Sequence, residues 1–183
     1  MTVENERTLL VLRHAKSDWS GGEADIDRTL NPRGQGQAAE VGSWLADQFS
    51  PIDAAVVSPA TRARATWALV SAELGHSPEA RIDERAYAAS VTDLLSIVQD
   101  LPDEQRTVIL VAHNPGLEEL VLLLVPDDRN PARDDVEVKF PTASLAELRF
   151  DIQDWERAGP GKAALIRFVR PRDLDSSLGP DTP

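Results

Sequence analysis

Two short aliphatic runs, each followed by a histidine, constrain the fold of this chain more than any other feature. Arg7–Leu12 is followed by Arg13-His14, and Arg106–Ala112 is followed by His113-Asn114. Continuous runs of Leu, Val and Ile bounded by polar residues are typical of parallel strands that are buried on both faces. Both segments are therefore expected to be central strands, and each ends in the same kind of side chain.

A third run, Ile52–Val57, ends at Ser58-Pro59, and helical patterns lie between the strands. We expect helices that begin at Asn31-Pro32, run from about Thr61 to Leu74, follow the capping box Ser90-x-x-Asp93, and run from Pro115-Gly116 to Val125. This alternation predicts an α/β fold, a three-layer sandwich with a mostly parallel central sheet flanked by helices. With 42% hydrophobic residues in 183, one such domain over residues 1–170 is expected.

The C-terminal third of the sequence follows a different pattern. We expect a polar loop over Pro126–Glu137, which either gates access to a site or is simply flexible. Two further strands, Ser144–Phe150 and Ala163–Val169, are expected to extend the sheet at its edges. From Pro171 onward the Pro, Asp, Ser and Gly content predicts a disordered tail, residues 171–183.

The charge and composition exclude several classes of partner. Lys plus Arg is 19 against 31 Asp plus Glu, a net charge of −12, so long-range repulsion argues against binding nucleic acid or an anionic membrane. The absence of cysteine excludes disulfides, thiol nucleophiles and thiolate metal sites. No secretory signal or membrane span is visible, so we expect a cytoplasmic protein. The oligomeric state cannot be read from the sequence, which has no long heptad seam.

The strand ends predict where the chemistry lies. Ligands bind in the crevice at the carboxyl ends of parallel strands, where two of the three histidines, His14 and His113, are expected. A lone histidine there is more often a structural cap, but two on one edge beside Arg13 favour a functional site. Arg62, in the first helical turn after Ser58-Pro59, can reach the same edge, or it is a solvated surface charge.

These residue types can transfer a phosphoryl group without metal or cofactor. The charge of Arg13 disfavours protonation of His14, which keeps its imidazole neutral and nucleophilic near pH 7. Arginines bind two phosphate oxygens at once, so Arg13 and Arg62 would hold a phosphoryl group while His113 donates to it.

Five sequence blocks then carry a resemblance that covers most of residues 8–150. They are Leu10-Val-Leu-Arg13-His14-Ala15-Lys16-Ser17-Asp18-Trp19, Asp27-Arg-Thr-Leu-Asn-Pro-Arg-Gly34, Ser58-Pro-x-x-Arg62-x-x-x-Thr66, Val111-Ala-His113-Asn-Pro115 and Pro141-Thr-Ala-Ser144. Together they resemble the histidine phosphatase superfamily, also called phosphoglycerate mutase-like. The Ala-Lys-Ser that follows His14 is similar to the SixA-like branch, whose best-known members are phosphohistidine phosphatases.

The resemblance implies a role for each matching residue. His14 would be the nucleophile that forms a phosphohistidine intermediate, Arg13 and Arg62 would bind the phosphate, and His113 would be the second pocket histidine. The commoner family opening has Gly at the position of Ala15 and Asn at that of Ser20. The second departure removes a phosphate-binding amide and makes mutase activity less expected.

A general acid is the open question. Glu84, in Arg81-Ile-Asp-Glu84-Arg85-Ala-Tyr87, resembles the segment that carries the acid in phosphoglycerate mutases, whereas SixA-like proteins usually lack a dedicated acid. The alternative is that Glu84 pairs with Arg85 or Arg81 on the surface. Asp18 is a weaker candidate that could instead cap a turn.

The leading hypothesis is a metal-independent phosphatase that acts on phosphohistidine in a phosphoprotein. The alternative is a small-molecule phosphomonoesterase that uses Glu84 as its acid. A phosphate- or phosphopeptide-binding module would not need the nucleophile, and the histidine spacing lacks the pairing of a zinc hydrolase. From the net charge, a substrate protein would be expected to be basic near its phosphorylated residue.

Overall fold

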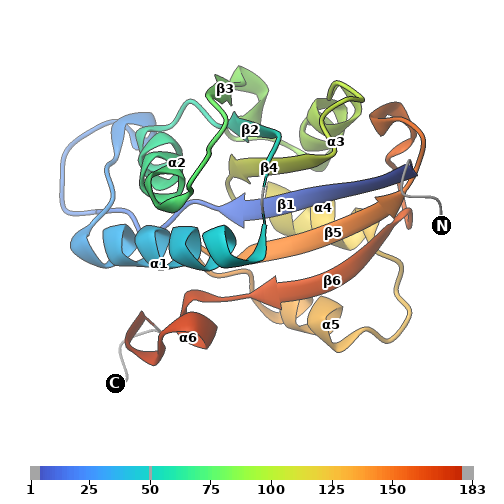
Figure 1. Ribbon diagram of the computed structural model, residues 1–183. Coiled ribbons are helices and arrows are strands. Elements are labelled where there is room, and N and C mark those ends of the chain that lie inside the picture. The colour runs from blue at the N-terminus through green and yellow to red at the C-terminus, as the bar shows by residue number, and fades with distance from the viewer. Residues whose placement is uncertain (1–4, 50, 179–183) are drawn as a thin grey trace.

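A six-stranded mixed sheet forms the centre of the computed structural model, which describes residues 5–49 and 51–178. The strand order is β3-β2-β4-β1-β5-β6 (Figure 1). The strands are β1 (Glu6–Arg13), β2 (Ala54–Val57), β3 (Ala80–Ile82), β4 (Thr107–Ala112), β5 (Leu145–Asp151) and β6 (Ala163–Val169). The first four are mutually parallel, while β5 is antiparallel to both β1 and β6. The sheet is therefore mostly parallel, as expected, and the last two strands extend it on one side.

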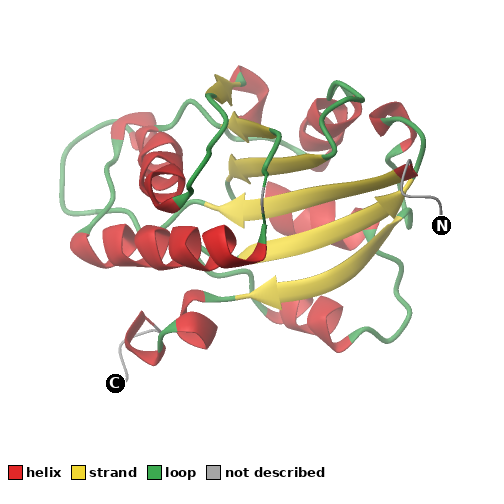
Figure 2. Ribbon diagram, viewed as in Figure 1, coloured by secondary structure: helices red, strands yellow, loops and turns green. Residues whose placement is uncertain are grey.

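Helices cover both faces of the sheet (Figure 2). One face is covered by α1 (Pro32–Gln48) and α2 (Thr61–Glu73), and the other by α3 (Val91–Gln99), α4 (Gly116–Leu124) and α5 (Pro131–Val138). This arrangement confirms the predicted three-layer α/β sandwich. No helix in residues 5–49 and 51–178 is both long and apolar enough to cross a membrane.

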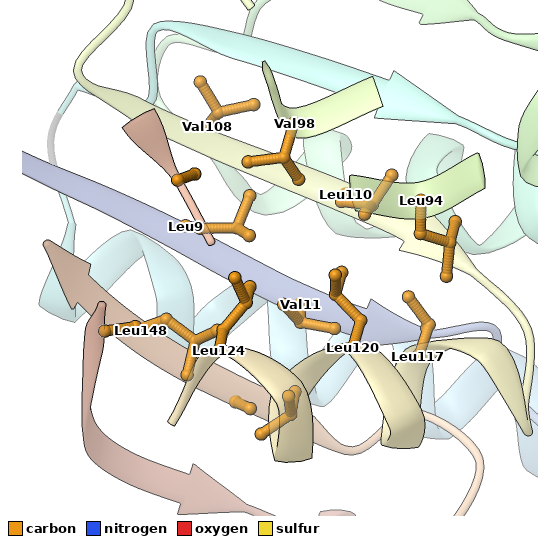
Figure 3. Close-up of a cluster of buried hydrophobic side chains, with 14 of the residues drawn as sticks. Leu9, Val11, Leu94, Val98, Val108, Leu110, Leu117, Leu120, Leu124 and Leu148 are labelled. Atoms are coloured by element: carbon orange, nitrogen blue, oxygen red, sulfur yellow. The ribbon is translucent and has the colours of Figure 1, made fainter. Parts of the chain in front are cut away.

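The central strands are buried on both faces because their alternate side chains enter two separate cores. Along β1, Leu9 and Val11 pack under α3 and α4, while Leu10 and Leu12 pack under α1 and α2. Figure 3 shows the first of these cores, with Leu120 of α4 over the strand. Every one of these positions is apolar, which explains the unbroken aliphatic run in the sequence.

The helix-start signals in the sequence operate as expected. The side chain of Asn31 accepts a hydrogen bond from the Gly34 N–H at 2.8 Å, and Pro32 occupies the first turn of α1. Ser90 and Asp93 form the complete capping box of α3.

Two expectations for the C-terminal part were wrong. Residues 131–137 of the expected polar loop form all of α5 except its last residue, and Val136 of this helix is fully buried. Asn130-Pro131 opens this helix with the same cap and proline as α1, a signal that the polar composition obscured. Within the expected disordered tail, α6 (Pro171–Leu174) and a 3-10 helix, η5 (Ser176–Leu178), contact α1, and residues 179–183 lie outside the described residues.

The carboxyl ends of β1, β2 and β4 lie at one edge of the sheet (Figure 1). Because β5 is antiparallel to β1, β5 begins at this edge, and β6 ends there. The segment 14–31, which contains the 3-10 helix η2 (Asp25–Asp27), leaves β1 here and contacts α2 before α1 begins. Residues from five strands therefore lie close to the end of β1.

Candidate active site

His14 and His113 lie side by side at this edge, at the ends of the neighbouring strands β1 and β4. Their ring centroids are 5.0 Å apart and their planes are inclined by 54°. The His14 N–H donates to the Ala112 carbonyl at 3.1 Å, which continues the strand pairing up to the first histidine. The prediction that both histidines lie on one edge agrees with this geometry.

The backbone fixes the protonation of the His14 ring. Its Nδ1 lies 2.8 Å from the carbonyl oxygen of Ala15, so Nδ1 carries the hydrogen and Nε2 is unprotonated. Arg62 Nε donates toward that Nε2 at 3.4 Å. The Ala15 N–H is held in turn by Thr66 Oγ1 at 3.0 Å. The ring is therefore held with a nucleophilic nitrogen beside a guanidinium group.

The His113 ring has the complementary arrangement. Its Nε2 lies 2.7 Å from Ser58 Oγ, which also accepts the Ala60 N–H at 3.3 Å. Ser58 Oγ, which accepts from Ala60, has its own hydrogen to donate to His113 Nε2, and on this basis we assign the ring hydrogen of His113 to Nδ1. That Nδ1 is buried and has no hydrogen-bond partner within the described residues.

Arg13 holds a second buried donor without a partner. One terminal nitrogen donates to the Phe140 carbonyl at 2.7 Å, while Nε has no partner within the part of the chain that the structure describes. A buried unpaired donor costs about 1–3 kcal/mol. Such a cost at both Arg13 and His113 fits donors arranged for the oxygens of a bound anion.

Both histidines are neutral at pH 7. Burial is the main cause that lowers the pKa of His14 to about 3, assisted by the charges of its neighbours and opposed by the Ala15 carbonyl. Burial, followed by the charge of Arg62, lowers the pKa of His113 to about 4. The sequence argument predicted the correct direction but assigned it to the charge of Arg13, whereas burial is the larger cause.

Arg62 is a buried residue and not a solvated surface charge. It is 6% exposed, and one terminal nitrogen forms an ion pair with Asp25 Oδ2 at 2.9 Å. Asp25 also accepts from Arg28 at 2.8 Å and from the Tyr87 hydroxyl at 2.8 Å. These hydrogen bonds, Tyr87 first, lower the pKa of Asp25 to about 2 against the effect of desolvation. Asp25 is therefore ionised, and its carboxylate orients the guanidinium group of Arg62.

Sequence reasoning missed Asp25 and Tyr87. Asp25 lies between the first two family blocks, in a segment without regular periodicity, so its partner could not be identified from spacing. Tyr87 was visible in the segment that carries Glu84, and it contacts His113 edge to face at 5.7 Å between ring centroids.

No hydrogen bond joins Glu84 to either histidine within the described residues. Glu84 opens the 3-10 helix η3 (Glu84–Ala86) and is exposed. Its carboxylate has no hydrogen bond or ion pair within the described residues, and Arg85 pairs instead with Asp83 and Asp100. Asp18 caps a turn, accepting from both Ser20 N and Ser20 Oγ.

The donor set at this edge is suited to an anion. Among residues 5–49 and 51–178, no three His, Cys, Asp or Glu side chains are grouped so that they could hold a metal ion. The His14 ring instead contacts Arg62 and lies beside the neutral ring of His113, Arg13 precedes His14 in the chain, and Asp25 pairs with Arg62. This arrangement can bind a tetrahedral oxyanion and present a nitrogen nucleophile to it.

The chain is similar to several known proteins. The family model of the histidine phosphatase superfamily (branch 1) matches residues 9–91. Uncharacterized protein Rv1276c of Mycobacterium tuberculosis is 36% identical over 163 residues, which cover 88% of this chain and all of that protein. A chloroplastic Arabidopsis thaliana protein, At3g52155, is 29% identical over 187 residues, which cover 94% of this chain and 80% of that protein.

Two solved structures share the fold over nearly the whole chain. One is the putative phosphohistidine phosphatase SixA from Nakamurella multipartitia, with a TM-score of 0.78 and 29% identity, covering 91% of this chain and 96% of that one. The other, a SixA of the same description from Agrobacterium tumefaciens, has a TM-score of 0.76 and 27% identity, covering 90% and 97%.

Proposed function

Because this chain belongs to the histidine phosphatase superfamily and is SixA-like, we propose that it hydrolyses phosphohistidine on a protein through a phosphorylated His14. One observation carries the proposal. The unprotonated Nε2 of a neutral, buried His14 lies 3.4 Å from Nε of the Arg62 guanidinium, and the His14 ring lies next to His113. A neutral imidazole beside anion-binding donors can attack phosphorus without prior loss of a proton.

In the first step, His14 Nε2 forms a bond to phosphorus while the bond from phosphorus to the substrate imidazole breaks. Arg13, Arg62 and the Nδ1–H of His113 would stabilise the charge on the three phosphoryl oxygens. The phosphorylated His14 ring gains positive charge, which its hydrogen bond to the Ala15 carbonyl stabilises. The substrate imidazole departs as a neutral ring when its other nitrogen already carries a proton.

In the second step, a water oxygen attacks the phosphorus, and the bond to His14 Nε2 breaks. His14 is restored with a free lone pair, inorganic phosphate is released, and the protons of the water pass to phosphate and solvent. Neither step requires an acid from the protein for a phosphohistidine substrate.

The need for an acid from the protein distinguishes the two candidate substrates. An alkyl or aryl phosphate loses an alkoxide or a phenolate, which is more basic than a neutral imidazole, so a proton from a positioned acid assists its departure. Glu84 is exposed, and its carboxylate makes no hydrogen bond to either histidine among the described residues. These observations favour a phosphoprotein over a small phosphoester as substrate.

The experiment measures phosphate release from a phosphohistidine protein and from an aryl phosphate. We expect His14→Ala to abolish turnover and to remove the acid-labile, alkali-stable phosphoenzyme that the wild type accumulates. The matched control is His76→Ala, which removes the third, exposed histidine and should leave both unchanged. Turnover that persists in His14→Ala would overturn the assignment of the nucleophile.

Glu84→Gln separates the two substrate classes, with the exposed Glu79→Gln as its matched control. We expect Glu84→Gln to keep the wild-type rate on phosphohistidine. A loss of about 10²–10⁴-fold on the aryl phosphate, the usual contribution of a general acid, would instead support the phosphomonoesterase.

A further inference from the structure

A groove of about 520 Å³ lies beside the candidate active site, on the β5–β6 side of Arg13. It is bordered by the segment after β1, the start of α1, the link between α5 and β5, and the chain from Arg170 to Leu178. Arg13 is common to the groove and to the candidate phosphate site. A ligand whose phosphoryl group reaches His14 could therefore extend into this groove.

The groove is basic although the protein as a whole is acidic. The chain has a net charge of −12, yet six cationic residues and one carboxylate, that of Asp135, border the groove. The cationic residues are Arg13, Lys16, Arg33, Lys139, Arg170 and Arg172. Positive charge of this density in an acidic protein creates a local field that attracts anions.

Three of these cations are available to a ligand. Arg170 is already paired with Asp173 at 2.9 Å and with Asp135 at 3.4 Å. By contrast, the side chains of Lys16, Lys139 and Arg172 are exposed and form no ion pair within the described residues. These three come from different segments of the chain.

The groove also offers apolar contact. Val138 is 84% exposed, although it is a large aliphatic residue, and it lines the groove with Pro141, Pro171 and Leu178. Exposed apolar surface surrounded by charge is typical of a recognition site. A small buried anion would be enclosed by converging donors, whereas exposed cations around an apolar floor suit an extended chain with several carboxylates.

We propose that this groove binds an acidic segment of the protein substrate, next to its phosphorylated histidine. The proposal rests on the proposed function and names the recognition surface of the same site. It reverses the expectation from the net charge, which was a partner that is basic near its phosphorylated residue. The charge bordering the site determines the partner, and that charge is positive.

The test compares two phosphohistidine peptides that differ only in their flanking residues, Asp and Glu in one and Ser and Gln in the other. We expect wild-type kcat/KM to be about tenfold higher for the acidic peptide at low salt, a change typical of a few exposed ion pairs together. The preference should shrink in 0.5 M salt, where the Debye length is only about 4 Å and the attraction between exposed charges is screened.

Charge-reversal variants test whether Lys139 and Arg172 bind the acidic peptide. The double variant Lys139→Glu with Arg172→Glu should abolish the preference through KM, and Lys139→Gln alone should reduce it. The matched control is Lys162→Glu, an exposed lysine just before β6, at the opposite edge of the sheet, which should keep the full preference. An equal loss in Lys162→Glu, or no preference in the wild type, would overturn the proposal.

A binding measurement separates this proposal from the proposed function. Fluorescence anisotropy with a labelled acidic peptide that carries no phosphate needs no catalysis. If the peptide binds the wild type and not the double variant, while phosphohistidine is not hydrolysed, the groove is supported as a site for acidic peptides and the proposed reaction is refuted. If phosphohistidine is hydrolysed but the acidic peptide binds no better than the neutral one, the groove assignment fails.

Discussion

Gly34 of α1 fixes the backbone next to the candidate nucleophile, and replacing it tests how the site is held. A Cβ built at Gly34 would lie 2.0 Å from the carbonyl oxygen of Lys16 and 2.8 Å from its carbonyl carbon and its nitrogen. Carbon–oxygen contacts are normally about 3.3–3.6 Å, so Gly34→Ala must displace helix or loop by more than about 1 Å. The displaced atoms are backbone, which has no rotamer to relieve the contact.

That displacement would reach the His14 ring. The peptide of Lys16 adjoins Ala15, whose carbonyl oxygen accepts the Nδ1–H of His14 at 2.8 Å. We expect Gly34→Ala to lower kcat/KM about 10²-fold, the typical cost of a 1 Å misplacement. Overpacking should also lower the free energy of unfolding by about 1–3 kcal/mol.

Gly36 provides a matched control in the same helix. A Cβ there would meet one side-chain carbon of Leu178 at 3.6 Å, an ordinary contact. Gly36→Ala is therefore expected to stabilise the protein, by up to about 1 kcal/mol of helix propensity, and to leave turnover unchanged. Urea unfolding and initial rates measure both variants. Wild-type activity and stability in Gly34→Ala, or an equal loss in Gly36→Ala, would refute the close-contact argument.

Three further predictions concern the site. Because the pKa values of His14 and His113 are lowered to about 3 and about 4, the unfolded chain binds protons first as the pH falls below about 6.5. The free energy of unfolding should therefore decrease from pH 6.5 toward pH 4, and the double His→Asn variant should flatten that slope in urea titrations. Asp25→Asn should lower kcat/KM about tenfold by releasing Arg62. Since the pKa of Asp25 is lowered to about 2, its contribution to stability is present above about pH 4 and is lost toward pH 2, so the variant and wild type should converge there. A chelator should leave turnover unchanged, and its abolition by EDTA would contradict metal-independent chemistry.

The sequence predicted the parts of the fold that depend on strong local patterns. The aliphatic runs of β1 and β4 identified the central strands, and the caps at Asn31 and Ser90 identified helix starts. The short edge strand β3 could not be predicted, because its three residues are not buried and show no apolar pattern. α5 was missed because its polar face dominates the composition and only Val136 is fully buried.

The residues of the candidate site likewise include some that the sequence predicted and some that it did not. His14, His113, Arg13 and Arg62 follow strand ends or a helix start, so topology alone predicts that they meet. Asp25 reaches Arg62 across 37 positions of sequence, and only tertiary structure determines such a contact. The basic groove could not be predicted for the same reason, since its lysines and arginines are distant in sequence. The net charge of the whole chain, −12, gives no sign of a local positive cluster.

The candidate catalytic histidines and the groove belong to different parts of the sheet, and the groove lies on the side of the antiparallel hairpin of β5 and β6. The two histidines follow the parallel strands β1 and β4, whereas the link before β5 and the chain after β6 border the groove. Insertions or exchanged residues in the segments that flank this hairpin, before β5 and after β6, could therefore change the substrate preference while the two histidines stay in place. Relatives with the same catalytic residues could bind different protein substrates through changes in these two flanking segments, with Arg13 common to the groove and the candidate phosphate site.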